Sequence, residues 1–337
     1  MKKKNILVIL FSLLLLGGVA GGTLWWQVAR KPLVDSASTW LYIRAGERAE
    51  AAFFDDWRMQ LAMRWTGCDE RRDACRLSGA YKITPRYSAL AVARKLLFNQ
   101  QDPVRMTFRG ARLKEQVAGQ MARHLACDSA EVLAAMLNPE FLHKTQFDTA
   151  NVCSLFLPDT YETYWDVTPE RLVDKMWSEY QKFWTPARLA AADSLHLTPR
   201  EVSVLASIAE EETNGRQERG VVARLYWNRL QRGMLLQADP TVKYSVGDFT
   251  LRRILLQHLE VESPYNTYKY PGLPPGPIRV VEKATIDTIL HARPNPYLYM
   301  CAKPDFSGRH NFAVTLSEHM KNADDYHRAL SARLKQQ

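Results

Sequence analysis

The chain has 337 residues, of which 46% are hydrophobic and 24% are charged, and its formal net charge is +9. This length suits two or three globular domains, and this composition excludes a disordered chain. The positive charge fits an anionic lipid surface or an anionic wall polymer better than nucleic acid. Acidic residues such as Asp55, Asp56 and Glu162 interrupt any basic stripe, so we expect no nucleic-acid partner.

The N-terminus predicts a membrane anchor. Three lysines at positions 2–4 precede an uncharged apolar run over residues 6–26, which has the ~20-residue length that a membrane-spanning helix requires. Trp25 and Trp26 suit the membrane interface, and the lysines favour a cytoplasmic N-terminus. We therefore expect a single-pass protein of the cell inner (plasma) membrane whose bulk is periplasmic. A cleaved signal peptide, with small residues at positions 19–22, is the alternative.

The five cysteines fit an oxidising compartment, where disulfides form and persist. The spacing suggests the disulfides Cys68–Cys75 and Cys127–Cys153, with Cys301 left over. A zinc site is the alternative, because His124 and Cys127 stand one helical turn apart. The sequence contains neither a CxxC nor an HxxxH motif, so we expect no metal and no other cofactor.

Strands and helices alternate after the anchor. The predicted elements are a strand over 41–43, a helix within 44–65, a strand over 80–83, a helix over 88–98, a strand over 104–108 and a helix over about 113–125. Such strand–helix units point to a small α/β region. An extended segment over 155–161 follows, and two helices, over 169–184 and from 185 to about 195, connect this region to the last domain.

Three consecutive glutamates end the helix that follows this connection. Thr198 caps the helix, Pro199 fits its first position, and Glu201 completes a capping box. At ~100° per residue, one buried face should hold Val202, Leu205, Ala206, Ala209 and Thr213.

The helical spacing gives the three glutamates different surroundings. Glu211 should point to solvent, while Glu210 and Glu212 should flank the buried face. Glu210 should cover the small residues Ala206 and Ser207 and leave room for a ligand. Burial at the edge of an apolar face disfavours the charged form of a carboxyl group, as a general acid near neutral pH needs. An ordinary solvated acidic face is the alternative.

Further elements complete the chain. They are a helix over 219–232 closed by Gly233, a short helix opened by Pro240 with Asp239 as its cap, a helix over 250–259, a strand over 297–302, and a last helix opened by a Thr315–Glu318 capping box. The irregular loop over 263–277, rich in proline, glycine and tyrosine, suits sugar binding or a rigid connection. His310 is interpreted as a hydrogen-bonded structural residue, with catalysis as the alternative.

Four segments in order resemble the endolytic murein transglycosylase family. They are LASIAEEET, LQADPTVKY, SPYNTYKYPGLPPGPI and HNFAVTLSEH. Upstream, SGAYKITPRYSALAVARKL and LPDTY resemble that family's sugar-binding, LysM-like region. The resemblance implies an α+β chain with a single N-terminal transmembrane helix. Its expected parts are a cytoplasmic start and anchor (1–27), a small α/β LysM-like region (28–170), a helical connection (171–197) and a mixed α/β lytic transglycosylase domain (198–337).

The resemblance also implies an activity. A peptidoglycan lytic transglycosylase of this kind is a lyase that cleaves the bond between N-acetylmuramic acid and N-acetylglucosamine within nascent strands. It leaves 1,6-anhydro ends and terminates glycan elongation. The implied catalytic acid is Glu210, the first acid of the motif. The implied substrate-binding residues are Glu212, Gln237, Asp239, Asn266, Thr267 and Tyr268. Glycan strands, and peptidoglycan synthases, are the expected partners.

Two alternatives to this activity stay open. A hydrolytic muramidase needs two carboxylates, which Glu210 and either Glu212 or Asp239 would supply. A non-catalytic peptidoglycan-binding scaffold would use only the LysM-like region. A lytic transglycosylase works with one acid, because the sugar's own 6-hydroxyl replaces water as the attacking group.

Overall fold

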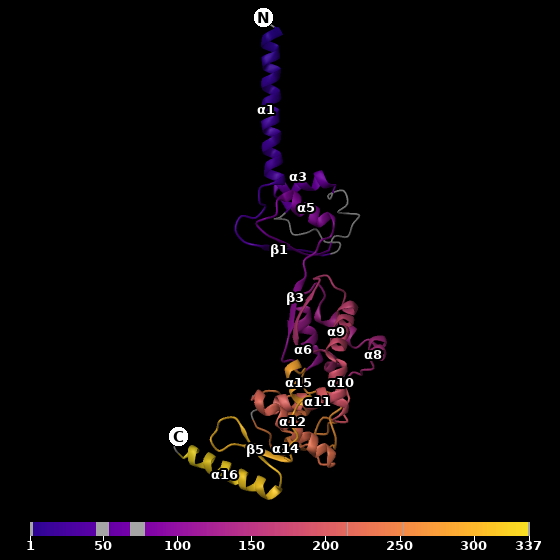
Figure 1. Cartoon of the computed structure of the whole chain (residues 1–337), viewed down its shortest axis with the longest axis vertical. Coiled ribbons are helices and arrows are strands. Elements are labelled where there is room, and N and C mark those ends of the chain that lie inside the picture. The colour runs from indigo at the N-terminus through magenta and orange to yellow at the C-terminus, as the bar shows by residue number, and fades with distance from the viewer. Residues whose placement is uncertain (1–2, 45–53, 68–77, 214, 252, 336–337) are drawn as a thin grey trace. The chain divides into compact units, whose positions relative to one another are not determined.

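The computed structural model describes residues 3–44, 54–67, 78–213, 215–251 and 253–335, which form two compact units (Figure 1). Unit 1 holds Met1–Met106, His124–Cys127 and Tyr161–Val167, and unit 2 holds Thr107–Arg123, Asp128–Thr160 and Thr168–Gln337. These units are defined by packing and not by activity, so the functional domain limits given above stay predictions. Cys68 and Cys75 lie outside the described residues.

Unit 1 contains one long helix, two short helices and an antiparallel pair of strands. They are α1 (Lys3–Ala29), β1 (Thr39–Ile43), α3 (Trp57–Thr66), β2 (Gly79–Ile83) and α5 (Ala89–Leu97). Leu41 lies opposite Tyr81 in the β1–β2 ladder. Alternation along β1 turns Leu41 and Ile43 into the core and leaves Trp40 and Tyr42 exposed.

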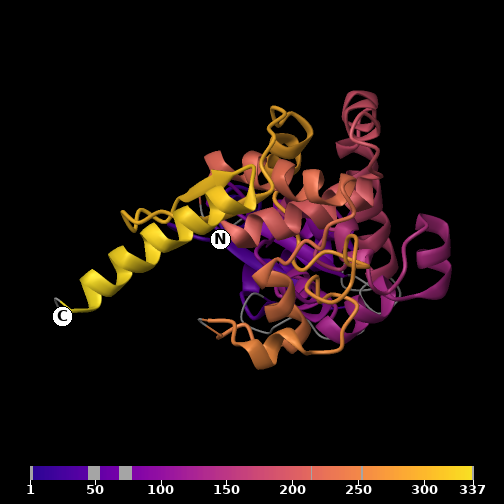
Figure 2. The same ribbon diagram turned by 90° about the horizontal axis from the view of Figure 1, so that it is seen from below.

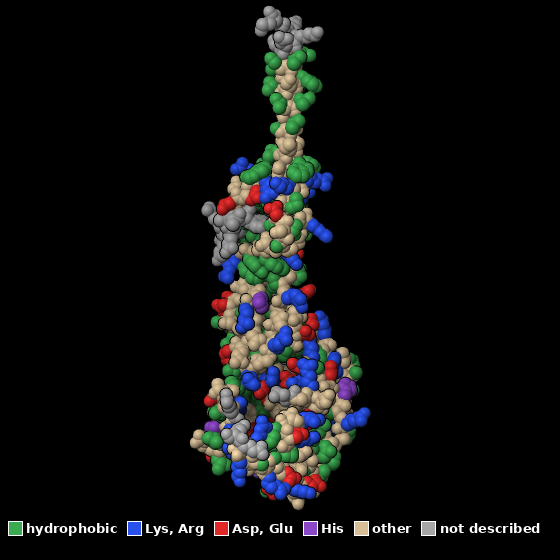
Figure 3. All heavy atoms as spheres, turned by 90° about the vertical axis from the view of Figure 1, so that its left-hand side faces the viewer, with side chains coloured by type: hydrophobic (Ala, Val, Ile, Leu, Met, Phe, Trp, Pro, Cys, Tyr) green, Lys and Arg blue, Asp and Glu red, His purple; other side chains and the backbone are tan. Residues whose placement is uncertain are grey.

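Helix α1 enters the core of unit 1 with its last turn. Val28 is fully buried and belongs to the same hydrophobic cluster as Leu41 and Met59. Along residues 7–26, by contrast, the side chains are exposed, and Figure 3 shows hydrophobic groups along the helix. Among the described residues, this is the one helix long and apolar enough to cross a membrane.

Unit 2 is mainly helical. Its helices are α6 (Lys114–Ala122), α7 (Ser129–Met136), α8 (Pro139–Thr145), the 3₁₀ turn η1 (Val152–Leu155), α9 (Pro169–Phe183), α10 (Pro186–Asp193), α11 (Pro199–Glu212), α12 (Arg216–Gln231), α13 (Asp239–Val246), α14 (Leu256–Leu259), α15 (Lys283–Leu290) and α16 (Leu316–Leu334). Its strands β5 (Tyr299–Ala302) and β6 (His310–Ala313) pair with each other. Strands β3 (Val104–Phe108) and β4 (Asp159–Thr163) also pair, and the division between the units runs through both of them.

Most predicted elements form, and the differences have local causes. Helix α7 is capped by Asp128 with Glu131 in a capping box that the prediction overlooked. Helix α15 was also unpredicted, because its N-cap Glu282 makes no side-chain cap and several of its residues are β-branched. The helix expected over 250–259 is wrong in extent, since only Leu256–Leu259 is helical.

The predicted Cys127–Cys153 disulfide is wrong. Cys153 is a free, buried thiol, and burial raises its pKa to about 12. A thiol in apolar surroundings disfavours the reactive thiolate. Cys301 also carries a free thiol, as predicted.

Helix α11 is the central helix of unit 2. The predicted capping box forms: the Glu201 amide donates to Thr198 Oγ1 over 3.3 Å, and the Thr198 amide donates to Glu201 Oε2 over 2.7 Å. Contrary to the prediction of one buried face, every residue over 202–210 is buried, because α10, α12, α13, α15 and η1 all pack against the helix. Figure 2 shows that α16, in contrast, projects its C-terminal end away from the other helices.

Candidate active site

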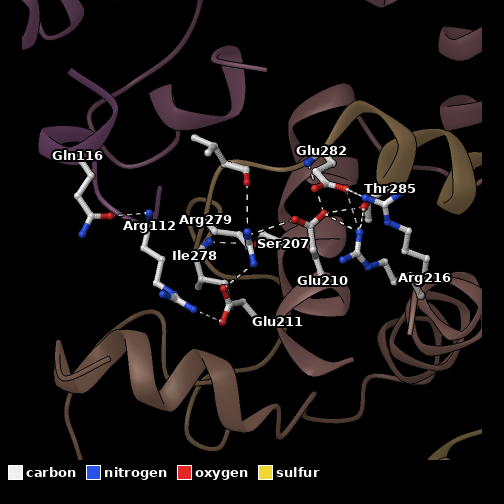
Figure 4. Close-up of polar contacts among 12 residues, drawn as sticks. Arg112, Gln116, Ser207, Glu210, Glu211, Arg216, Ile278, Arg279, Glu282 and Thr285 are labelled. Atoms are coloured by element: carbon white, nitrogen blue, oxygen red, sulfur yellow. Dashed lines mark hydrogen bonds and ion pairs between the residues drawn. The ribbon is translucent and has the colours of Figure 1, made fainter. Parts of the chain in front are cut away.

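Glu210 lies in the interior between two arginines (Figure 4). Its side chain is 1% exposed, with Arg219 Nη1 3.4 Å from Oε2 and Arg279 Nε 3.3 Å from Oε1. Oε2 also accepts hydrogen bonds from the Thr285 hydroxyl over 2.6 Å and from the Glu282 amide over 3.3 Å.

Glu211 is also paired, which contradicts the prediction that it points to solvent. Oε1 accepts from Arg279 Nη1 and Oε2 from Arg112 Nη2, each over 2.8 Å, and the side chain is 12% exposed. Arg279 therefore bridges Glu210 and Glu211 (Figure 4). The bridge fastens the segment before α15 to the end of α11, and the Ile278 amide reinforces it by donating to Ser207 Oγ over 3.0 Å.

Glu212 has the surroundings of a general acid. Its Oε2 atom is buried and has no hydrogen-bond partner among the described residues, although the residue as a whole is only partly buried. Burial, and then the negative charge of Asp239, raise the pKa of Glu212 to about 7, while a hydrogen bond from the Tyr226 hydroxyl opposes the rise. Such a carboxyl group is protonated in a substantial fraction of molecules near neutral pH.

A cavity of about 420 Å³ opens beside Glu212. Its lining comes from the end of α11, from α13 and from the segment that follows α13. The lining residues are Glu211, Glu212, Asp239, Pro240, Lys243, Leu251, Arg253 and Ile254. Glu210 is not among these described lining residues, although the adjacent Glu211 is.

Asp239 lines this cavity, but its structural role differs from the prediction. Helix α13 begins at Asp239 itself, with Ala238 as N-cap and no side-chain cap, so the capping role is wrong. The Tyr268 hydroxyl instead donates to Asp239 Oδ1 over 2.7 Å, and burial together with this bond raises the pKa of Tyr268. Asp239 and Glu212 thus present two carboxyl groups to one cavity.

Asn266 and Thr267 hold the loop and do not face the cavity. Asn266 is fully buried, and its Nδ2 donates to the carbonyl oxygens of Leu259 and Val261 over 2.8 and 2.9 Å. Thr267 Oγ1 accepts from the Ala238 amide over 3.0 Å and lies 2.8 Å from Thr241 Oγ1. These bonds hold the loop that carries Tyr268, whose hydroxyl lies against Asp239.

Gln237 is exposed at the turn before α13 and adopts a left-handed backbone with φ 52°. Its amide donates to the Thr267 carbonyl over 3.1 Å, and its Oε1 lies 3.3 Å from Arg229 Nη1. These bonds offset the energetic cost of a backbone conformation that non-glycine residues seldom adopt. Among the predicted site residues, Gln237, Asp239, Thr267 and Tyr268 are therefore brought together as expected.

Three residues of this region escaped the sequence analysis. Tyr226 lies within the predicted helix over 219–232 and no motif identifies it, although its hydroxyl donates to Glu212. Arg219 and Arg279 had no motif to identify them, because their partners lie elsewhere in the sequence. His310 is hydrogen-bonded, with its Nδ1 3.0 Å from Glu218 Oε2.

Comparison with known proteins gives a consistent assignment. The model of the YceG-like family matches residues 47–325. A Bacillus subtilis (strain 168) protein named endolytic murein transglycosylase is 42% identical over 122 residues, which are 36% of this chain and 33% of that protein. A protein of the same name from Streptococcus pneumoniae serotype 2 is 28% identical over 173 residues, covering 50% of this chain and 31% of that protein. The chain thus spans about a third of the length of these curated relatives.

One solved structure has a similar fold. It is a YceG-like protein of Listeria monocytogenes with a TM-score of 0.56 and 23% sequence identity. The match covers 84% of this chain and 98% of that one. At this identity the likeness concerns the fold, which is mixed α/β in both units described above.

Proposed function

Because the chain belongs to the YceG-like family, we propose that it is an endolytic lytic transglycosylase of peptidoglycan in which Glu212 is the catalytic acid. The supporting observation is the Glu212 carboxyl group, whose buried Oε2 has no hydrogen-bond partner among the described residues. It borders a cavity of about 420 Å³ and has a pKa of about 7. The sequence-based choice of Glu210, whose carboxyl group lies between Arg219 and Arg279, stays the alternative assignment of the acid.

The proposed reaction cleaves the bond between N-acetylmuramic acid and N-acetylglucosamine. Glu212 Oε2 gives its proton to the glycosidic oxygen as the bond from that oxygen to the anomeric carbon breaks. The 6-hydroxyl oxygen of the muramic acid then bonds to the anomeric carbon, and its proton returns to Glu212. The products are a free 4-hydroxyl and a 1,6-anhydro end, no water is consumed, and one carboxyl group acts first as acid and then as base.

Asp239 favours one competing function. It lines the same cavity as Glu212, and a hydrolytic muramidase uses a second carboxylate toward water or as nucleophile. In the proposed transglycosylase, Asp239 instead raises the pKa of Glu212 through its charge. Gln237 and Tyr268 complete the proposed substrate-binding surface, while Asn266 and Thr267 support it from behind.

Digestion of purified sacculi separates these functions. Mass spectrometry of the products should detect 1,6-anhydro ends from the parent protein and none from Glu212→Gln. Reducing ends in their place would identify a muramidase. Equal release by the parent and Glu212→Gln would assign the acid role to another residue, with Glu210 the first to test. If the parent itself released no fragments above a protein-free control, the non-catalytic scaffold would be the better description.

The cellular setting of the proposed enzyme follows from the remaining parts. We assign α1 as a single-pass anchor in the inner membrane, because residues 7–26 are apolar and exposed. The chain outside the membrane would then be periplasmic, with a LysM-like region that binds glycan. Anchored in this way, the enzyme would cut nascent strands near their synthases and terminate elongation.

A further inference from the structure

Helix α3 has an apolar face on each side. Met59, Ala62 and Met63 are buried in the core of unit 1. Trp57, Leu61 and Trp65 follow the i, i+4, i+8 spacing that places side chains on another face, and the two tryptophans are 50% and 45% exposed. We call the surface formed by Trp57, Leu61, Arg64 and Trp65 the α3 face.

The α3 face lies beside the end of α1. The two helices pack against each other, and Figure 1 shows α3 next to the point where α1 enters unit 1. Arg58, next to Trp57, donates through Nη1 to the Pro32 carbonyl over 3.0 Å and through Nη2 to the Leu33 carbonyl over 3.4 Å. These bonds fix the first turn of α3 to the residues that directly follow α1.

No spacer separates the exposed apolar part of α1 from the packed core of unit 1. Residues 7–26 of α1 rise about 30 Å, which equals the hydrocarbon thickness of a bilayer. The next buried residue, Val28, already belongs to the core of unit 1, and it lies about 3 Å further along the helix axis. The polar headgroup layer is about 5–8 Å thick on each side, so it overlaps the adjoining surface of unit 1.

The chemistry of this surface suits that layer. Tryptophan concentrates at membrane interfaces because its ring is apolar and its N–H is polar. Arg30, which follows α1 and lies 5.7 Å from the Trp25 ring, is exposed, and so is Arg64 on α3. Figure 3 shows basic and hydrophobic side chains together where α1 meets unit 1. Such a mixture fits anionic phospholipid headgroups.

We propose that the α3 face binds the periplasmic surface of the membrane, with Trp57 and Trp65 among anionic phospholipid headgroups. The proposal rests on α1 being a retained anchor, as assigned above. It gives unit 1 a second membrane contact beyond the single span.

Lipid photolabelling of the full chain tests this proposal. The protein is reconstituted in nanodiscs of phosphatidylethanolamine and phosphatidylglycerol with a diazirine phospholipid, and labelled peptides are mapped by mass spectrometry. We expect label in the α3 peptide and none in the β1 peptide. The β1 peptide is a matched control, because Trp40 and Tyr42 are exposed and stacked with ring centroids 6.0 Å apart. Equal labelling of the two peptides overturns the proposal.

Variants identify the contact and its alternatives. Trp57→Ser/Trp65→Ser should lower the label in α3 to the β1 level, whereas Trp40→Ser/Tyr42→Ser should leave it unchanged. If the first variant instead loses binding to isolated sacculi and keeps its lipid label, the α3 face binds glycan and not lipid, and the proposal fails. Label in α1 reports the anchor separately: α1 labelled without α3 rejects the α3 contact alone, and α1 unlabelled rejects the anchor as well.

Discussion

Glu210 and Glu212 are two positions apart on α11 and have opposite electrostatic surroundings. Glu210 lies within 3.4 Å of guanidinium nitrogens of Arg219 and Arg279. Glu212 lies near the carboxylate of Asp239, and its Oε2 is buried without a hydrogen-bond partner among the described residues. This difference motivates the proposal of Glu212 as the acid, with Glu210 as the alternative.

Exchanging each glutamate for glutamine should therefore give different defects. Glu210→Gln removes the buried carboxylate that Arg219 and Arg279 share. The two arginines keep Glu282 and Glu211 as partners, so we expect a loss of about 1–3 kcal/mol in stability. Glu212→Gln should remain folded and lose glycan cleavage by a factor of about 10²–10⁴, the contribution of a general acid. Urea denaturation measures the change in stability, and product analysis per folded molecule measures the loss of glycan cleavage. If folded Glu212→Gln cleaves glycan as fast as the parent, Glu212 is not the catalytic acid and another residue is.

The difference in stability between the parent protein and Glu212→Gln should depend on pH. The pKa of Glu212 rises from an ordinary value of 4.5 to about 7 on folding, so the folded state binds the proton more tightly. The parent protein then keeps its full stability below pH 4.5 and loses part of it as pH rises through 7. Glutamine avoids that loss. At pH 8 the free energy of unfolding of Glu212→Gln should therefore exceed that of the parent by about 2–3 kcal/mol, which urea denaturation measures. At pH 4.5 the two proteins should have similar stability, and a constant difference across this range would contradict the pKa.

Substituting two neighbours of Glu212 should shift the alkaline limb of the pH–activity profile in opposite directions. Tyr226→Phe removes a hydrogen bond that lowers the pKa of Glu212, so the limb should move to higher pH. Asp239→Asn removes a charge that raises this pKa, so the limb should move to lower pH, and Asn can still accept from Tyr268. The pH profile of kcat/KM measures both shifts. The cavity is also bordered by the charged residues Lys243, Arg253 and Glu211, which both variants retain.

Asn266 offers a test of the loop that supports Tyr268. Asn266→Asp keeps the shape but removes both donors to the Leu259 and Val261 carbonyls. We expect a loss of about 2–4 kcal/mol in stability from the buried, unpaired groups and weaker substrate binding, visible as a higher KM. Thermal denaturation and sacculus-binding assays measure the two effects. A variant with unchanged stability would show that the loop has other sufficient supports.

Cys153 should behave as a buried thiol. With a pKa of about 12 and no disulfide, it should resist iodoacetamide in the native protein and react fully in guanidinium chloride. Peptide mass spectrometry without reductant gives the result directly. A Cys127–Cys153 peptide in the oxidised protein would contradict the structure.

The sequence predicted the local features of the site better than its long-range contacts. The capping box of α11 depends on Thr198 and Glu201, three residues apart, and it forms as predicted. The roles of the glutamates depend on Arg279 and Tyr226, which come from other elements. A helical projection assumes solvent on one side, but α11 has neighbours on all sides, so Glu211 is paired and not solvated. The same long-range effect explains why Tyr268, and not the start of α13, binds Asp239.

The enclosure of α11 has a consequence for how a glycan would be cut. A helix packed by five neighbours, with its last turn fastened through Arg279, has little freedom to carry the Glu212 carboxyl group toward a substrate. The adjustment must come from the other partner, a polysaccharide whose linkages rotate easily. We therefore expect strand tension and crosslinking in the wall, more than motion of the enzyme, to decide which bonds come within range.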